Sequence, residues 1–306
     1  MAIVSWNTRA LLARCLESLK PDVNSGIADV WVVDNASTDG SADLVRERFG
    51  WANLIVSEEN LGFGSAANLA ASKTDSEWIA IANADIAVHA RALKSLLEAG
   101  ARDPRAGALG PRLRMPNGQT QHSVGAFPTI AFSLLHASGA FRFRSPIADR
   151  FAFPGRWDSE RRRRVPWAMG AFLLVRREAW DQVGGFDERQ WMYAEDLDLG
   201  WRLSQAGWAT RYEPLAVVEH EVAASTSQQF GAERAPLWQR ATYGSIARRR
   251  GPGYARAVAL INLVHALSRW PLVIMRSRGH ADAGERRAAY VRWVRVHLDA
   301  VARPER

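Results

Sequence analysis

VVDNASTDGS, the segment at residues 32–41, passes from an apolar run through a polar turn into the start of a second element. The apolar run predicts a buried strand that ends at Asp34, and residues 41–49 have the spacing of a helix. Ligands on open α/β sheets bind beyond the carboxyl ends of the strands, which is where Asp34 falls. Taken alone, Asp34 could equally accept hydrogen bonds from backbone amides of the turn.

The alternation of strand and helix continues on both sides of this segment. Apolar runs at 2–5, 53–57 and 78–82 predict further strands. Helices are expected after Thr8, which can act as a cap, and over 65–72 and 90–99. Continuous apolar strands that alternate with helices are typical of a parallel sheet covered on both faces. We therefore predict an α/β fold with a mostly parallel sheet flanked by helices.

Charge divides the chain into two parts. The 306 residues carry a net charge of +8, yet residues 223–306 alone hold 15 arginines against five acidic residues. We predict a catalytic domain over 1–222 and a basic helical extension over 223–306, with helices over 229–250 and 254–275. Such an extension could meet an anionic membrane surface or nucleic acid, or it could be a solvated tail.

The extension also holds the one candidate for a membrane span. Its apolar core over 257–267 contains Asn262 and His265 and is followed by Arg269 and Pro271. A spanning helix needs about 20 apolar residues, so we expect this segment to lie flat on a membrane or to pack on the domain. The single cysteine, Cys15, and the absence of a visible signal peptide fit a cytoplasmic protein, peripheral on the inner face of the cytoplasmic membrane.

A glycine-rich loop opens the helix expected over 65–72. Gly62, Gly64 and Ala67 satisfy the G-x-G-x-x-G/A pattern, and Asp85 lies at about the ~20-residue spacing of a ribose-binding acid. A dinucleotide-dependent oxidoreductase is therefore an alternative. That fingerprint belongs on the first strand–helix turn, however, and here two strands precede it. We favour a loop whose backbone approaches a nucleotide in another geometry.

Three further groups carry oxygen or nitrogen ligands at the ends of predicted elements. Asn83 and Asp85 follow an apolar strand, where a carboxylate suits Mg²⁺ or Mn²⁺ bridged to a diphosphate. Asp196, beside Glu195, begins a helix, whose dipole favours an ionised general base, although it could be an ordinary cap. His220 follows a short apolar run and could be structural or a metal ligand.

The order of these motifs resembles glycosyltransferase family 2, and most closely its bacterial rhamnosyltransferase-like branch, over residues 1–222. The resemblance is carried by Val4-Ser5-Trp6-Asn7, by residues 32–41, by Glu59-Asn60-Leu61-Gly62-Phe63-Gly64, by Asn83-Ala84-Asp85, by Gly184-Gly185-Phe186-Asp187 and by Tyr193-Ala194-Glu195-Asp196-Leu197-Asp198-Leu199.

The resemblance implies a GT-A fold, a nucleotide-sugar donor, a divalent metal and inversion at the anomeric carbon. Residues carried over by motif would line the base and ribose site, namely Trp6, Asn7, Asp34 and Asn60, with Gly62, Gly64 and Asn83 also near the donor. Asp85 would hold the metal, with His220 as a further candidate. Asp196 would be the base, with Glu195 beside it near the acceptor.

The substrates follow from the same resemblance. We expect dTDP-rhamnose as the donor and a glycan or lipid-linked cell-envelope intermediate as the acceptor, and we do not expect a nucleic-acid partner. The chain departs from the family in having Asn-Ala-Asp at 83–85 and no glycines after His220, and it begins within the first strand. These departures keep a catalytically inactive nucleotide-sugar-binding module as a third reading.

Overall fold

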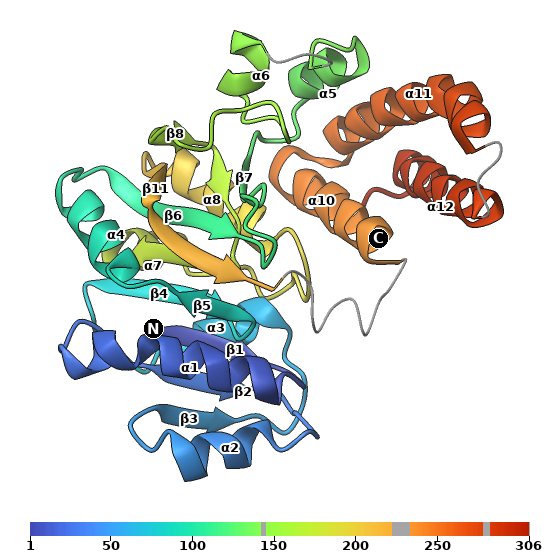
Figure 1. The fold of residues 1–306 in the computed structure, drawn as a ribbon. Helices are drawn as coiled ribbons and strands as arrows, with labels where there is room; N and C mark the ends of the chain where they lie inside the picture. Colours follow the sequence, from blue (N-terminus) through green and yellow to red (C-terminus); the bar gives the residue numbers. More distant parts are fainter. Residues whose placement is uncertain (142–144, 222–232, 278–281, 306) are drawn as a thin grey trace.

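The apolar runs of the amino-terminal part form neighbouring strands of one sheet in the computed structural model, which describes residues 1–141, 145–221, 233–277 and 282–305 (Figure 1). The first elements are β1 (Ala2–Ser5), α1 (Arg9–Asn24), β2 (Trp31–Asp34), α2 (Ser41–Arg48), β3 (Asn53–Val56), α3 (Phe63–Ala71), β4 (Trp78–Asn83), β5 (Ile86–Val88), α4 (Ala92–Ala101) and β6 (Ala106–Arg114). The bounds agree with the predicted elements to within a few residues, except that β5 and β6 were not foreseen.

The remaining elements complete the sheet and add helices around it. They are β7 (Val124–Gly125), α5 (Ile130–Ala137), α6 (Pro146–Arg150), β8 (Arg163–Val165), β9 (Trp167–Ala168), β10 (Phe172–Arg176), α7 (Arg177–Val183), α8 (Glu195–Gln205), β11 (Ala209–His220), α10 (Arg234–Arg250), α11 (Pro252–Ser277) and α12 (Ala283–Ala302). The principal sheet has the order β3-β2-β1-β4-β10-β6-β11-β5, and β8 pairs with β11.

Strands β1 to β4 are parallel. The order in which they are added to the sheet changes side at β1. β2 and β3 extend the sheet on one side of β1, whereas β4 pairs on the other side. The register places Ser5 opposite Asp34 and Val4 opposite Asn83. Crevices at such reversal points are where open α/β sheets bind ligands, so the polar ends of β1, β2 and β4 meet at one place.

The second half of the sheet brings a distant histidine to this crevice. β10 pairs antiparallel with both β4 and β6, and β11 runs parallel to β6. β5 pairs antiparallel with β11, with Ile86 opposite His220. This pairing places His220 next to Asp85, the residue before β5.

Apolar residues on both faces of the sheet form its core, as the uninterrupted apolar strands predict. On one face, α1 and α4 bury side chains such as Leu12, Leu16 and Leu96. On the other face, α3, α7 and α8 contribute Ala67, Trp180 and Leu199 among others. The central strands are therefore covered on both sides, and the strand ends are left to carry the polar groups.

Helices α10, α11 and α12 pack on one another beside the sheet (Figure 1). Tyr243, Val258 and Val296 are among the buried residues they share. Arg249 of α10 ties the group to the sheet domain through carboxylates of Asp187 and Asp198, at 2.7 and 2.6 Å. The expected domain boundary at 222/223 and the start of the helix expected from residue 229 lie outside the described residues.

Helix α11 has 26 residues and continues through Pro271, although a proline within a helix removes one backbone hydrogen bond. By length and composition alone it could cross a membrane. The expectation of a helix that lies flat on a membrane or packs on the domain, rather than one that spans, stays a prediction. α12 was not foreseen.

Candidate active site

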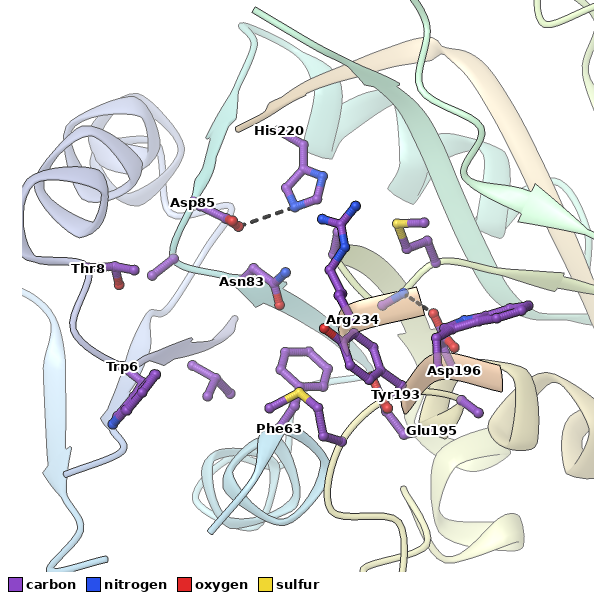
Figure 2. A pocket seen from close by; sticks show the side chains of 18 of the residues that line it. Trp6, Thr8, Phe63, Asn83, Asp85, Tyr193, Glu195, Asp196, His220 and Arg234 are labelled. Atoms are coloured by element: carbon purple, nitrogen blue, oxygen red, sulfur yellow. Dashed lines mark hydrogen bonds and ion pairs between the residues drawn. The ribbon is translucent and has the colours of Figure 1, made fainter. Parts of the chain in front are cut away.

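A cavity of about 460 Å³ opens at the carboxyl ends of the parallel strands (Figure 2). Its lining joins the first sheet strands, the start of α8, the end of β11 and two of the carboxyl-terminal helices. It includes Trp6, Thr8, Asn35, Asn60, Asn83, Asp85, Gln121, Trp167, Tyr193, Glu195, Asp196, His220, Arg234, Trp238 and Trp293. Most of the site residues named from the sequence therefore face one space.

Asp85 and His220 form the polar wall of this cavity. Asp85 Oδ1 lies 3.2 Å from His220 Nε2, and both side chains are almost fully buried. Neither atom has a hydrogen bond among the described residues, because their mutual geometry is unsuitable. A carboxylate oxygen and an imidazole nitrogen that face each other unbonded are a donor set suited to a divalent cation.

Gln121 determines which nitrogen of His220 is free to act as a ligand. Its Oε1 atom lies 2.7 Å from His220 Nδ1, and its Nε2 atom faces the Met169 sulfur at 3.4 Å. An amide oxygen accepts, so we assign the proton to Nδ1, which leaves the Nε2 lone pair towards Asp85. Metal-binding histidines are commonly oriented in this way by a partner on the other nitrogen.

Protein ligands alone would not fill a metal coordination shell here. Among the described ranges, no group of three histidine, cysteine, aspartate or glutamate residues could hold a metal ion. Asp85 and His220 therefore fit a cation whose remaining ligands are substrate phosphate oxygens and water, as Mg²⁺ commonly binds.

Asp196 lies in the first turn of α8 and is held by two backbone donors. Gly170 N–H donates to its Oδ2 atom at 3.0 Å, and Leu197 N–H donates to its Oδ1 atom at 2.7 Å. Gly170 has no side chain, and an added Cβ would lie 3.5 Å from the Asp196 Cβ atom. Asp196 is not the helix cap, which is Ala194.

Burial shifts the acidity of both carboxyl groups at the start of α8. It raises the pKa of Asp196, against the opposing effect of its backbone hydrogen bonds. Burial, reinforced by the charge of Asp196, raises the pKa of Glu195 to about 8. Tyr193 and Ala194 before them have φ of 64° and 58°, a strained conformation for residues with side chains. Perturbed acids on strained backbone beside a cavity are typical of a catalytic site.

The residues expected at the nucleotide end are only partly exposed to the cavity. Trp6 and Asn60 line it, whereas Asn7 and Asp34 do not. Asn7 Oδ1 accepts from Thr38 N–H at 2.8 Å and so holds the turn over 35–40. Asp34 accepts from Ser37 N–H at 3.2 Å, and its buried Oδ1 atom has no described partner.

The glycines of the loop before α3 allow another segment of the chain to pack closely, and they do not widen the cavity. A Cβ on Gly62, whose φ is +80°, would lie 2.2 Å from the Trp191 carbonyl oxygen. A Cβ on Gly64 would lie 3.1 Å from the Phe186 Cβ atom. Neither glycine lines the cavity, so the formal dinucleotide pattern here is explained by packing between segments 60–64 and 186–191. Thr8 is the N-cap residue of α1, as predicted, but its hydroxyl bonds Ser5 at 3.1 Å and makes no hydrogen bond to the first turn of the helix.

Several lining residues were not foreseen from the sequence, among them the polar or aromatic Gln121, Arg234, Trp238 and Trp293. Arg234 and Trp238 lie in the first two turns of α10, and Trp293 lies in α12. None stands in a motif that can be recognised along the chain. The sequence does not show where a helix packs, so it does not show that a tryptophan in that helix faces a cavity.

Comparisons with known proteins agree with this geometry. Residues 1–145 match the family model described as Glycosyl transferase family 2, and residues 119–280 match Glycosyl transferase family group 2. A Mycobacterium tuberculosis protein named N-acetylglucosaminyl-diphospho-decaprenol L-rhamnosyltransferase is 36% identical over 266 residues, which cover 83% of this chain and 85% of that one. The chain belongs to glycosyltransferase family 2. It is a glycosyltransferase similar to the rhamnosyltransferases of the family.

Solved structures confirm the predicted GT-A fold of this family 2 chain. The mannosyltransferase PcManGT of Pyrobaculum calidifontis, solved with GDP-Man and Mn²⁺, has a TM-score of 0.55 at 18% identity and covers 99% of this chain and 85% of that chain. GalNAc-T7, solved with UDP, GalNAc and Mn²⁺, has a TM-score of 0.57 at 16% identity, over 78% of this chain and 46% of that one. The family assignment also decides against the oxidoreductase alternative.

Proposed function

We propose that the chain transfers a sugar from a nucleoside diphosphate to a hydroxyl of a lipid-linked glycan, with inversion, and that a divalent cation assists. The observation that carries the proposal is the placement of the Asp85–His220 pair and Asp196 on the walls of one cavity (Figure 2). The pair suits a cation bound to diphosphate, and Asp196 suits a base for the incoming hydroxyl.

The donor would lie with its nucleotide along the ends of β1, β2 and β4. Trp6 offers an aromatic face, and Asn60 is locked by Asn35, which donates to its Oδ1 atom at 2.9 Å. The unpaired Oδ1 atom of Asp34 would accept a ribose hydroxyl or a base N–H. Asn7 supports this wall by holding the turn that follows Asp34.

Asp85 and His220 would hold the cation against the donor diphosphate. When bound, a divalent cation there stabilises the negative charge that develops on the departing diphosphate. Arg234 would add a second positive charge, and its side chain extends from α10 towards His220 in Figure 2. Among the described residues it has no hydrogen-bond or ion-pair partner. A guanidinium beside a diphosphate site offers bidentate hydrogen bonds to phosphate oxygens.

Asp196 would accept the proton of the acceptor hydroxyl. The hydroxyl oxygen then forms a bond to the anomeric carbon while the bond from that carbon to the diphosphate breaks, and the nucleoside diphosphate leaves with the electron pair. Gly170 and Leu197 N–H groups hold the carboxylate in position, and its raised pKa brings it closer to neutrality, which suits a general base. A single displacement without a sugar–enzyme bond inverts the anomeric carbon.

Glu195 would remain protonated near neutral pH and so place no second charge beside the base. Aromatic side chains offer faces for the sugar rings, and Trp167, Trp238 and Trp293 all line the cavity. We propose a rhamnosyl donor such as dTDP-rhamnose and a polyprenyl-diphosphate-linked acceptor, with support from the printed name of the M. tuberculosis relative. With such an acceptor, we propose a cytoplasmic enzyme that works at the inner face of the cytoplasmic membrane.

A direct test incubates the protein with nucleotide-sugars and a GlcNAc-diphosphate-lipid acceptor, with Mn²⁺ or with chelator, and follows the product by mass spectrometry. Transfer from dTDP-rhamnose that needs the cation supports the proposal. Transfer from another nucleotide-sugar, and not from dTDP-rhamnose, would show that the donor is that other nucleotide-sugar. Binding of nucleotide-sugars without any transfer would favour the catalytically inactive module.

A further inference from the structure

We propose that the outward sides of α11 and α12 form a docking face for an anionic membrane. The face consists of exposed apolar side chains on two helices, interleaved with arginines. Its apolar members are Leu260, Val264, Leu267 and Met275 on α11, with Val291 and Leu298 on α12. Below, these six residues are called the apolar face.

The spacing of the α11 residues places them along one side of the helix. They follow one another at intervals of four, three and eight residues, and at about 3.6 residues per turn such positions fall in one stripe. All four are between 51% and 60% exposed. The opposite side of α11 carries Ala255, Val258, Ala259 and Ala266, which are buried.

Exposed apolar residues concentrate in this part of the molecule. Of the 13 large apolar side chains that are exposed within the described ranges, seven belong to α10, α11 and α12. Scattered exposed apolar residues are ordinary, whereas a contiguous group marks an interaction surface. The concentration therefore calls for a partner that covers it.

Charge identifies the partner as an anionic lipid surface. α11 contains three arginines and no acidic residue. Arg256 lies one turn before Leu260, and Arg295 lies between Val291 and Leu298 on the same side of α12. Arginines beside an apolar stripe can extend towards lipid phosphates while the stripe enters the acyl boundary. Two copies of this face would instead place arginines against arginines.

The contacts of α11 favour a helix that lies along the membrane rather than across it. Asn262 donates to the Tyr243 hydroxyl at 3.0 Å, and Tyr290 donates to the Ala266 carbonyl at 2.8 Å. These bonds join the inner side of α11 to α10 and α12, and α5 packs on it as well. The inner side of α11 is therefore held by neighbouring helices, although the length of the helix would suffice for a span.

The docking face also lies on helices that reach the cavity. Trp293 of α12 and Trp238 of α10 line it, and Trp238 is itself 37% exposed. A membrane that contacts α11 and α12 would thus lie beside the helices that line the cavity, where a lipid-anchored acceptor would enter. This last step rests on the proposed function, since it assumes an acceptor with a lipid anchor. The docking face itself does not.

The test measures co-sedimentation of the full chain with phosphatidylglycerol vesicles and with phosphatidylcholine vesicles. Leu260, Val264 and Leu267 are replaced together by serine, and the matched control replaces Ile27, Val56 and Leu215, which are exposed on the sheet domain. We expect the wild type and the control to bind anionic vesicles, and the α11 variant to bind at least about tenfold more weakly. Arg256→Gln with Arg295→Gln should weaken binding to the anionic vesicles more than to the neutral ones.

Equal vesicle binding by the α11 variant and the wild type would overturn the proposal. So would a wild type that ignores vesicles and is a dimer by light scattering, with the α11 variant a monomer, because a second copy would then cover the face. Binding of dTDP with Mn²⁺, measured on each variant, reports whether the sheet domain remains folded. Vesicle binding without any nucleotide binding would reject the proposed function and leave the docking face standing.

Discussion

Asp85 Oδ1 and His220 Nε2 face each other at 3.2 Å without a hydrogen bond. The two residues lie far apart in the sequence and meet because β11 pairs with β5. A neutral imidazole that donates through Nδ1 presents a lone pair to the carboxylate, an arrangement that a cation between them would stabilise.

This relationship predicts a role for Gln121, whose side chain bonds His220 Nδ1 and the Met169 sulfur within the described part of the chain. Gln121→Ala should lower the affinity for Mn²⁺ in the presence of dTDP by about 10–100-fold, because His220 loses the partner that orients it. Isothermal titration measures the affinity, and Gln119→Ala, in an exposed turn, serves as the control. An unchanged affinity in the Gln121 variant would remove His220 from the metal site.

A comparison of two glycine variants distinguishes the cost of backbone strain from the cost of a steric clash. Gly62 and Gly118 both have φ of +80°, but only at Gly62 would a Cβ meet another atom within 4 Å, the Trp191 carbonyl oxygen. Gly118→Ala should cost about 1 kcal/mol of unfolding free energy, and Gly62→Ala about 3 kcal/mol. Denaturant unfolding of both variants checks this difference, and equal losses would show that segments 60–64 and 186–191 do not pack as described.

Glu195 predicts a dependence of stability on pH. Its pKa is about 8 in the folded protein and ordinarily near 4.3, so the folded state holds more protons between these values. Stability from this group is present at low pH and is lost as pH rises through 8, by a few kcal/mol at about 1.4 kcal/mol per pKa unit. Glu195→Gln removes the titration, so its melting temperature relative to wild type should rise from pH 5 to pH 9. A constant difference would contradict the buried position of Glu195.

Arg249 predicts how firmly α10 is attached. Asp198 is fully buried and bonds Arg249, which also reaches Asp187. Arg249→Met leaves these carboxylates without that partner and should cost about 3 kcal/mol of unfolding free energy. Arg250→Met, the neighbouring control, removes stacking over the Trp201 and Tyr254 rings and should cost about 1 kcal/mol. Similar losses for the two variants would mean that the ion-pair network contributes little.

The sequence allowed the first half of the sheet to be predicted because its strands are continuous apolar runs. Asn83 and Asp85, which were expected just beyond a parallel strand, line the cavity because the carboxyl end of that strand meets it. In the part that contains antiparallel pairs, β5 and β6 were not foreseen. Short or mixed strands such as Ile86–Val88 have no distinctive period, and only their partners define them.

The rest of the site depends on packing that a linear pattern does not show. Gly62 matches a nucleotide-binding pattern, but a glycine is needed there because the Trp191 carbonyl oxygen lies too close for a side chain. Asp34 stands at the predicted strand end but does not line the cavity, whereas its neighbour Asn35 does. Arg234 and Trp293 reach the cavity from helices whose positions are set by contacts among α10, α11 and α12.

The most direct measurement of the central claim compares Asp196→Asn with the wild type in two assays on the same preparation. One assay follows sugar transfer to the acceptor, and the other follows binding of the nucleotide with Mn²⁺. Glu98→Gln, a surface carboxylate on α4, is the control. We predict that Asp196→Asn lowers turnover by about 10²–10⁴-fold while the nucleotide affinity stays unchanged. Turnover near the wild-type rate in the Asp196 variant would contradict the claim that this carboxylate is the base.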